Sequence, residues 1–510
     1  MNHAPLSGTE QAWAALGGDP ALLARIGSSA QPSSSEHLSS SARLGSPEDL
    51  GSSEDLDACG SDRLLPARLP VMELARSAVA VCSLAAAELA ARRTGGPVPR
   101  VRIDDGAVAT AFTSERHLRI DGRAATTFAP LSRFWRTADG WVRTHANYPH
   151  HRARLLATLG LPADTPDDTA VDTAAASFAG RPSDEIERTV YAAGGLAVAA
   201  RTPGQWAADP RGAALAGTPL VGRGRIDGAP VRRTAALTGE PLLPAAGLRV
   251  LDLTRVIAGP VATRTLALLG ADVLRIDAPQ LPESPDAHSD TGFGKRSVEL
   301  DLAGRSGRAA FEELLADADV VVVGYRPGSV ERFGLTPRSL AARRPGLVIG
   351  RLSAWGHGPW ARQRGFDSLV QVATGIASVE AVGPEGRPGA LPAQALDHGT
   401  GYLLAAAVLR ALTEQHDEGG SRLVTLSLAR TAAWLLDGLP ARREPNADTA
   451  AAADTAADPS YDPEKWLTET DGPLGRLRHA LPPVAFDGAP ADWSRPPGPL
   501  GADATAWLTA

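Results

Sequence analysis

The sequence has little lysine, little cysteine and no long apolar run. Only two of its 510 residues are lysine, Lys295 and Lys465, and only two are cysteine, Cys59 and Cys82. Two cysteines build neither a disulfide framework nor a metal-binding spacing, so we expect a reducing, cytoplasmic location. No run approaches the roughly 18 apolar residues of a membrane span, and the first residues lack the order of a signal peptide. We therefore expect a protein that is neither exported nor embedded in a membrane.

Clustered positive charge is also lacking. The formal net charge is -7, and no block of lysine and arginine occurs. Binding to phosphate backbones needs such a cluster, so no nucleic-acid partner is expected. The turn after the first strand of the main block reads TRVIAGP and lacks G-x-G-x-x-G, and no G-x-x-x-x-G-K-[ST] loop is found. Nicotinamide, flavin and nucleoside triphosphate chemistry are not expected, and no cofactor or metal is predicted.

From about residue 246 the pattern alternates between strand and helix. Four β-branched apolar runs, at 247–255, 271–279, 318–327 and 345–356, are separated by helical patterns at 259–270 and 304–318 and by a shorter one before 345. This spacing predicts an α/β fold with a parallel, Rossmann-like sheet and helices on both faces. Ligands of such sheets bind at the carboxyl ends of the strands.

Further along, PAQALDHGTGYLLAAAVLRALTEQ places one acid, Asp397, at the start of a long apolar helix pattern. Aspartate is a favoured N-cap, so the residue pattern leaves open whether Asp397 caps a helix or reacts. The stretch 70–93 can be laid against this helix, with Glu73 opposite Asp397. Each stretch is followed by a turn with glycine and a β-like run, which suggests a partial internal repeat.

Five motifs, in this order, resemble those of the class III CoA-transferases. They are LDLTRVIAGPVATRTLALLGADVLRID, GKRSVELDL, VGYRPGSVERFGL, RLSAWGHGPWARQRGFDSLVQVATGIAS and ALDHGTGYLLAAAVLRALTEQ, and they cover about 247–436. The resemblance implies that Asp397 carries the acyl group and that CoA moves between an acyl-CoA and a carboxylic acid. By motif, the residues expected to bind CoA are Arg255, Val256, Ala258, Lys295, Arg296, Tyr325 and Arg332. The family often carries His and Gln where this chain has Arg255 and Ile257, and Asn-Phe where it has Gly324 and Tyr325, so some contacts must differ.

The chemistry that the resemblance implies uses two covalent intermediates. A carboxylate with an ordinary pKa near 3.9 is about fully ionised at neutral pH and needs no base to attack a thioester. Attack by Asp397 would give a mixed anhydride, and the returning thiolate would give an aspartyl-CoA thioester. A helix start at this position would help to keep the carboxylate ionised.

Two alternatives stay open. Racemases of the same fold use a histidine in G-H-D, where this chain has Gly365-Phe366-Asp367, and His398 beside Asp397 is the other candidate base. A chain that binds CoA esters without turnover is the second alternative, because the glycine-rich loop of some transferases is not recognisable. The histidines of HANYPHH (145–151) have no partner at metal-ligand spacing, so no metal is expected there.

The order of segments departs from the family layout. The small domain is missing after the main block, and its likeness lies upstream, at 134–160 and 213–225. We therefore expect a partial copy fused to a main copy, acting as a homodimer or as a monomer whose halves mimic the family's interlocked dimer. The predicted regions are an N-terminal segment with a Ser-rich linker (1–62), a partial copy of the large domain (63–130), a smaller α+β domain (131–245), the main large domain (246–436), and a linker with the closing segment (437–510).

Overall fold

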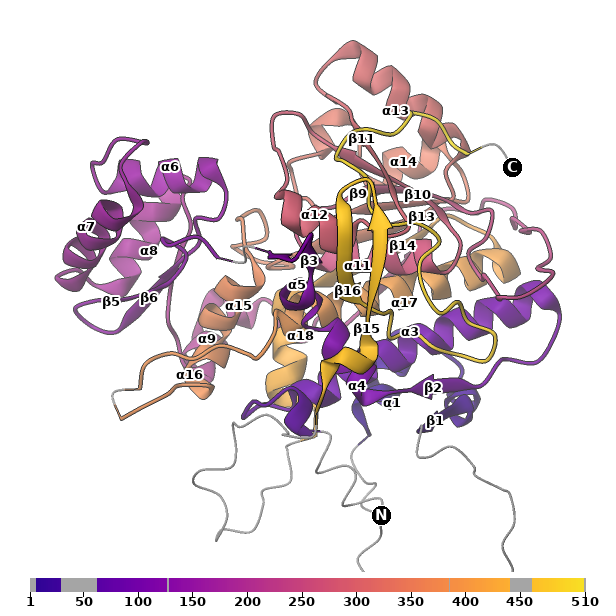
Figure 1. Cartoon of the computed structure of the whole chain (residues 1–510), viewed down its shortest axis with the longest axis horizontal. Helices are drawn as coiled ribbons and strands as arrows, with labels where there is room; N and C mark the ends of the chain where they lie inside the picture. Colours follow the sequence, from indigo (N-terminus) through magenta and orange to yellow (C-terminus); the bar gives the residue numbers. More distant parts are fainter. Residues whose placement is uncertain (1–5, 29–61, 126–127, 385, 441–460, 509–510) are drawn as a thin grey trace, which may run out of the picture.

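The structure is a computed structural model. It describes residues 6–28, 62–125, 128–384, 386–440 and 461–508. These residues form a large body around one sheet and a smaller unit set to one side of it (Figure 1). Cys59, most of the predicted Ser-rich linker within 1–62 and most of the linker predicted at the start of 437–510 lie outside the described residues.

Seven strands form the main sheet, in the order β11-β10-β9-β12-β13-β14-β8. The first six are mutually parallel, and β8 pairs antiparallel with β14 at one edge. The predicted α/β fold with a parallel sheet is confirmed, and β9, β10, β12 and β13 lie within the four predicted runs. The bounds are β8 (Gly222–Arg225), β9 (Arg249–Leu253), β10 (Asp272–Asp277), β11 (Arg296–Glu299), β12 (Val320–Val323), β13 (Val348–Ser353) and β14 (Arg422–Ser427).

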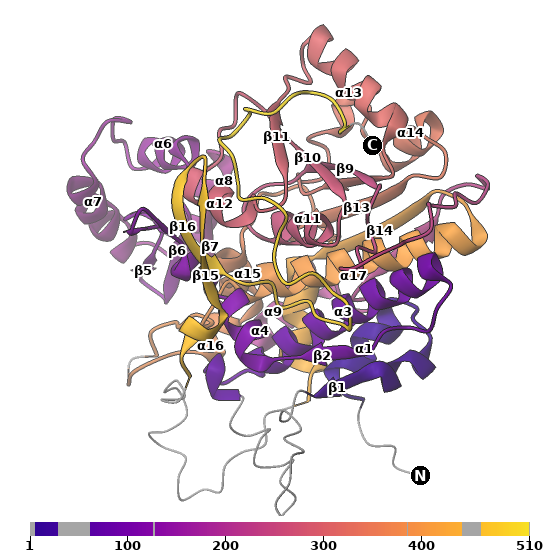
Figure 2. The same cartoon turned by 45° about the vertical axis from the view of Figure 1, so that its right-hand side comes forward.

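Helices cover both faces of this sheet, as Figure 2 shows. Val320 and Val322 of β12 pack into one hydrophobic cluster, and Val321 and Val323 pack into the other. Successive strand residues point to opposite faces, so a run of valine is suited to a strand buried on both sides. The helices on one face are α13 (Arg305–Asp317) and α14 (Pro337–Arg343); those on the other are α11 (Ala258–Leu268), α17 (Ala395–Glu418) and α3 (Val71–Thr94).

The helices α3 and α17 form the centre of the core, side by side and running in the same direction. Gly399 lies so close to α3 that an added Cβ would be 3.4 Å from Leu74. Further along, the buried ion pair of Arg410 with Glu88, 2.5 Å, joins the two helices. By length and composition α3 could cross a membrane, but 94% of its most apolar stretch is buried inside the body. It is therefore packed as a core helix.

The order of helix, strand and short helix occurs twice in the chain. The 24-residue α3 leads to β2 (Val101–Ile103) and α4 (Asp105–Ala111), and the 24-residue α17 leads to β14 and α18 (Leu428–Ala433). β2 pairs in parallel with β1 (Ile26–Ser28) as β14 pairs with β13. When the sequence is aligned so that Glu73 matches Asp397, β2 matches the last three residues of β14. Their parallel partners, β1 and the last three residues of β13, then occupy matching positions as well. This likeness supports a partial copy, which stays a prediction.

The smaller unit has its own three-stranded antiparallel sheet, β5-β6-β7. A separate cluster that includes Trp135, Val142 and Phe178 forms its core. The chain then returns to the large body through α9 (Pro203–Ala208), α10 (Pro210–Ala213) and β8. The unit contains β5 (Phe134–Arg136), β6 (Trp141–Thr144), β7 (Ala197–Ala199), α6 (Pro149–Thr158), α7 (Asp167–Ala179) and α8 (Ser183–Ala192).

The end of the chain packs on the large body. The hairpin of β15 (Leu467–Gly472) and β16 (Gly475–Ala480) is extended by β3 (Arg119–Ile120) and β4 (Arg123–Ala124). Beyond the hairpin, the Asp503 amide donates to the Ser297 carbonyl, 2.9 Å, beside the edge strand β11. The remaining helices are α1 (Gly8–Ala15), α5 (Ser114–His117), α12 (Pro285–Thr291), α15 (Asp367–Thr374) and α16 (Ile376–Val379).

Candidate active site

A cavity of about 470 Å³ lies where the large body meets the smaller unit. Its size is within the range of small-molecule pockets. Three parts of the chain line it: Glu115, Arg116, Ala125, Phe128 and Ala129 from the region before the smaller unit; His145, Asn147 and Tyr148 from the smaller unit; and Val256, Ile257, Ser284, Asp286, Ala287, Asp290, Thr291, Phe366, Asp367, Ser368, Gln394 and Asp397 from the large body.

Asp397 lines this cavity from the first turn of α17. It is the third residue of the helix, and the N-cap residue, Gln394, makes no side-chain capping bond. The capping acceptor is Asp367, whose Oδ2 accepts the backbone N–H of Asp397 at 2.9 Å. The interpretation of Asp397 as the helix cap is therefore wrong, because a second aspartate performs that function and the Asp397 carboxylate is left facing the cavity.

The two aspartates are buried together, with 6% of Asp397 and 1% of Asp367 exposed. Burial, followed by the nearby carboxylates of Asp367 and Glu115, raises the pKa of Asp397 well above its ordinary value. Burial also raises the pKa of Asp367 to about 6, although the helix N–H groups favour its ionised form. In the described part of the chain no ion pair reaches either group. Both effects disfavour the ionised form of Asp397, in contrast to the ordinary pKa that the sequence-based prediction assumed.

Glu115 connects this pair to His398. The Nε2 of His398 lies 3.3 Å from the Oε2 of Glu115, and the imidazole packs against the ring of Phe112. His398 is fully buried and does not line the cavity. The histidine next to Asp397 in sequence is thus directed away from the cavity.

A different histidine lines the cavity. The ring of His145 stacks on Phe366, with centroids 3.8 Å apart and planes 6° apart. His145 is 5% exposed, and its Nδ1 has no hydrogen-bond partner among the described residues. Burial, and then Arg143, lower the pKa of His145 to about 3, so the ring is neutral at physiological pH. A neutral imidazole carries one N–H donor and one acceptor nitrogen.

The loop before α11 forms another wall and is held in a strained conformation. Val256 has φ of 73°, which is rare for a β-branched residue, and its N–H donates to the Oε2 of Glu283 at 2.9 Å. Glu283 also lies 3.5 Å from the Arg255 guanidinium and accepts a bond from the Tyr148 hydroxyl at 2.6 Å. Tyr148 belongs to the smaller unit, so one buried carboxylate fixes the loop and joins the two parts of the molecule.

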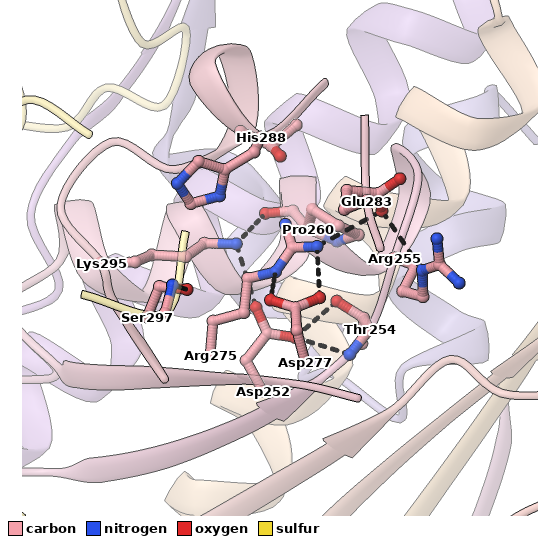
Figure 3. A network of polar contacts seen from close by, with 12 residues as sticks. Asp252, Thr254, Arg255, Pro260, Arg275, Asp277, Glu283, His288, Lys295 and Ser297 are labelled. Atoms are coloured by element: carbon pink, nitrogen blue, oxygen red, sulfur yellow. Dashed lines mark hydrogen bonds and ion pairs between the residues drawn. The ribbon is translucent and has the colours of Figure 1, made fainter. Parts of the chain in front are cut away.

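Glu283 is ionised by this arrangement. Burial alone would raise its pKa, but Arg255 and Arg275 outweigh the burial and lower the pKa to about 2. Figure 3 shows the carboxylate beside Arg255, with Arg275 reaching toward it and toward Asp277. The guanidinium of Arg255 also lies over the ring of Tyr148, 4.9 Å from its centroid.

Two of the predicted CoA-binding residues lie in internal ion pairs. The Lys295 ammonium is 3.0 Å from Asp252 and donates to the Pro260 carbonyl at 2.9 Å (Figure 3). The Arg296 guanidinium forms an ion pair with the Asp272 carboxylate at 2.8 Å. Both residues are buried and outside the cavity lining.

The other predicted CoA-binding residues are spread along the carboxyl edge of the sheet. Val256 lines the cavity, and Ala258 begins α11 beside it. Tyr325 follows β12 and is partly buried, while the Arg332 guanidinium rests on the Phe333 ring, 4.6 Å from its centroid. The structure therefore brings Val256 to Asp397, places Arg255 one residue away, and leaves Lys295, Arg296, Tyr325 and Arg332 outside the cavity. The CoA-binding role of all seven residues stays a prediction.

Sequence reasoning missed Glu115, Glu283 and His145 as parts of this site. Glu115 and His145 lie more than 250 positions before Asp397, so no local pattern connects them with it. Glu283 occurs in LPESPDAH, which carries no motif. The motif HANYPHH could have indicated this part of the site, since His145 and Tyr148 both line the cavity. Within the described residues, its histidines belong to no cluster able to hold a metal ion.

Comparison with known proteins finds a family match for one part of this chain. The model of CoA-transferase family III matches residues 245–449. This segment is therefore similar to CoA-transferase family III. The family III segment holds Asp397, Asp367 and the Val256 loop. It also holds six of the seven strands of the main sheet and more of the cavity lining than any other part.

Several curated and solved relatives match part of the chain. The "Probable fatty acyl-CoA transferase Rv3272" of Mycobacterium tuberculosis is 35% identical over 212 residues, which are 39% of this chain and 54% of that protein. The formyl-CoA:oxalate CoA-transferase of Streptomyces coelicolor is 33% identical over 193 residues, or 36% and 47% of the two chains. The crystal structure of the hypothetical protein Rv3272 from M. tuberculosis matches at 34% identity and TM-score 0.36, over 39% of this chain and 59% of that one.

The chain thus spans about half the length of the curated relatives it matches. Eight of the twenty cavity-lining residues, from Glu115 to Tyr148, precede the family III segment. Part of the cavity wall is therefore built from sequence that these comparisons do not cover.

Proposed function

We propose that this protein transfers CoA between an acyl-CoA thioester and a carboxylic acid, with Asp397 as the nucleophile. The observation that carries the proposal is the carboxylate of Asp397, buried at the wall of a cavity with no ion-pair partner in the described structure. Its helix-capping role is taken by Asp367. The family of residues 245–449 supports the same reaction class.

The proposed reaction has four steps that balance without a cofactor. The Asp397 carboxylate attacks the thioester carbonyl, the C–S bond breaks, and a mixed anhydride and CoA thiolate form. The thiolate attacks the Asp397 side of the anhydride and releases the donor acid as its carboxylate. An acceptor carboxylate attacks the resulting aspartyl-CoA thioester and again releases the thiolate. The thiolate then attacks the acceptor carbonyl, which gives the new acyl-CoA and restores the Asp397 carboxylate.

The raised pKa of Asp397 sets a condition on the first step. Only the carboxylate form of Asp397 attacks, whereas burial and two neighbouring carboxylates favour the protonated form. The proton must leave before the anhydride forms, so activity should rise with pH through the pKa of the aspartate pair.

We propose direct CoA contacts for Arg255, Val256, Ala258, Tyr325 and Arg332. Lys295 and Arg296 act indirectly in this proposal, because both are buried and paired with internal carboxylates. Arg255 also has an internal partner, Glu283, but it is more exposed and adjoins the lining residue Val256. Lys295 donates to the Pro260 carbonyl and to the Thr263 hydroxyl. It therefore positions the first turn of α11, next to the Val256 loop.

The racemase alternative has less support in this geometry. Phe366 has no titratable group, and His398 is buried against Glu115, outside the cavity lining. His145 lines the cavity, but a histidine whose pKa is about 3 is a weak base for a carbon acid. Incubation of acyl-CoA in D₂O separates the two reactions, since a racemase would exchange the α-proton without exchanging the acid.

Trapping by hydroxylamine tests the proposed intermediates directly. The protein is incubated with acyl-CoA and hydroxylamine, and peptides containing Asp397 are examined by mass spectrometry for a hydroxamate. The modification should occur on Asp397 and be absent from Asp397→Asn. Retained CoA-ester binding with no hydroxamate for any acyl-CoA tried would overturn the transferase proposal in favour of a binding protein without turnover.

We further propose that residues 63–130 descend from a partial duplication and complete the site within one chain, in a cytoplasmic protein. Glu115 and Phe128 come from this region and line the cavity. The repeated order of helix, parallel strand and short helix supports the duplication. Sedimentation equilibrium tests whether the active species is a monomer, and exchange activity confined to a dimer fraction would count against completion within one chain.

A further inference from the structure

We infer that the acyl groups and acids used at the Asp397 site carry no second carboxylate. The inference rests on the proposed CoA transfer and concerns the substrate class of that same cavity. It comes from the charges of the side chains that line the cavity. They are strongly biased toward acids.

Five carboxylates and one arginine line the cavity: Glu115, Asp286, Asp290, Asp367 and Asp397 against Arg116. Three of the acids have basic partners outside the lining. Asp286 lies 2.7 Å from Arg123, Asp290 lies 3.3 Å from Arg264, and Glu115 lies 3.3 Å from the His398 imidazole. Acylation of Asp397 removes its own charge. Asp367 and Glu115 still flank the reacting group, so a second carboxylate on the substrate would be placed against like charge.

The lining offers one cation to a second carboxylate, and it is poorly placed. Half of the Arg116 side chain, 51%, is exposed, and its Nε lies 3.9 Å from Glu115. An exposed pair of this kind contributes little, because water screens it. Arg116 therefore cannot offset the buried carboxylates on the inner wall.

The other nearby arginines face other groups. Arg143 stacks on the ring of Phe128, 5.3 Å from its centroid, and Phe128 rather than Arg143 lines the cavity. Arg255 is held by Glu283 and lies over Tyr148. Neither guanidinium belongs to the lining, although the charge of Arg143 interacts with that of Asp367.

Apolar and aromatic side chains form the rest of the wall that an acyl group would meet. Phe128, Tyr148 and Phe366 contribute rings, and Val256 and Ile257 contribute branched aliphatic groups. Phe128 is 40% exposed, which is unusual for a ring of its size in this chain. A hydrocarbon chain that covers Phe128 would remove this surface from water.

Matched four-carbon substrates test the inference. Butyryl-CoA and succinyl-CoA are compared as donors, and labelled butyrate and succinate as acceptors, by following label into acyl-CoA. We expect kcat/KM for the butyryl substrates to exceed that for the succinyl substrates by about 100-fold or more, because placing like charges together costs several kcal/mol. Comparable kcat/KM for succinyl-CoA would overturn the inference and leave the transferase proposal standing.

A pair of variants at one lining position shows whether charge causes the preference. Ala287→Lys adds a cation to the wall, and Ala287→Met adds a similar length without charge. The butyryl-to-succinyl ratio should fall about 10-fold in Ala287→Lys and stay near the wild-type ratio in Ala287→Met. Equal ratios in the two variants would contradict a charge-based preference. Absence of both exchange and Asp397 hydroxamate with every donor would instead overturn the transferase proposal and, with it, this inference.

Discussion

Replacing Glu283 with glutamine should destabilise the protein by an amount that the structure allows one to calculate. The side chain is fully buried and interacts with Arg255, Arg275, the Tyr148 hydroxyl and the Val256 amide. A pKa held at about 2 instead of the ordinary 4.5 corresponds to about 3 kcal/mol of stability at neutral pH. The isosteric Glu283→Gln variant keeps an oxygen acceptor and loses the charge, so it isolates this contribution.

The sign of the pH dependence follows from the depressed pKa. Glu283 stabilises the folded state above pH 4.5, and this stabilisation is lost as the pH falls toward about 2. The difference in unfolding free energy between wild type and Glu283→Gln should therefore be about 3 kcal/mol at pH 7 and shrink as the medium becomes acidic. Urea denaturation of both proteins over this pH range, followed by fluorescence, measures it.

Tyr148→Phe is the matched control for the neutral part of this network. It removes one hydrogen bond to Glu283 and should cost about 1 kcal/mol, with little change between pH 7 and pH 5. Because Glu283 also holds the Val256 amide, Glu283→Gln should raise KM for acyl-CoA. A Glu283→Gln protein within 0.5 kcal/mol of wild type at pH 7, or a pH-independent difference, would refute the assigned ionic role.

Three further outcomes concern the cavity itself. Asp397→Asn should raise the free energy of unfolding at pH 8, and this gain should shrink toward pH 4, because a raised pKa makes the buried acid destabilising once it ionises. Urea titrations at the two pH values measure the gain. A lower free energy of unfolding at pH 8 would contradict the prediction. Asp367→Asn removes a like charge, so the rise of kcat/KM with pH should move to lower pH, and an unmoved profile would show that the two acids are uncoupled. His145→Phe should keep the stacking contact with Phe366. It should lower kcat about 10- to 100-fold if the imidazole N–H contacts the reacting group. An unchanged kcat would show that His145 only packs against Phe366.

The sequence allowed the central strands to be predicted, because their burial on both faces leaves a clear pattern. Val320 to Val323 in β12 is such a run, and β9, β10 and β13 carry similar ones. The edges were not predicted. β11 is a four-residue strand that contains arginine and glutamate, and β8 reads GRGR, a composition that carries no strand signal. Both strands depend on tertiary pairing for their conformation.

Site residues could be predicted from the sequence where the order of the motifs alone identifies them. Asp397 was found in this way, and it lines the cavity. Motif position does not reveal whether a charge faces inward. Lys295, which the motif predicts to bind CoA, forms a buried ion pair with Asp252. Glu115 and His145 reach the cavity through contacts between segments far apart in sequence, and residue patterns contain no record of such contacts.

Glu73 and Asp397 occupy matching positions in the suggested internal repeat. Comparing their contacts shows why a reactive role explains Asp397 better than a structural one. Glu73 has a full set of partners: it pairs with Arg76 at 2.9 Å and accepts from the Gly8 amide at 3.1 Å and the Ser77 hydroxyl at 3.1 Å. Asp397 is more deeply buried, lies beside two other carboxylates, and has no ion-pair partner within the described chain. A buried acid without a partner costs stability, and the helix that carries it is capped by another residue. Among the described residues no contact of Asp397 offsets that cost, which agrees with the nucleophilic role proposed for it.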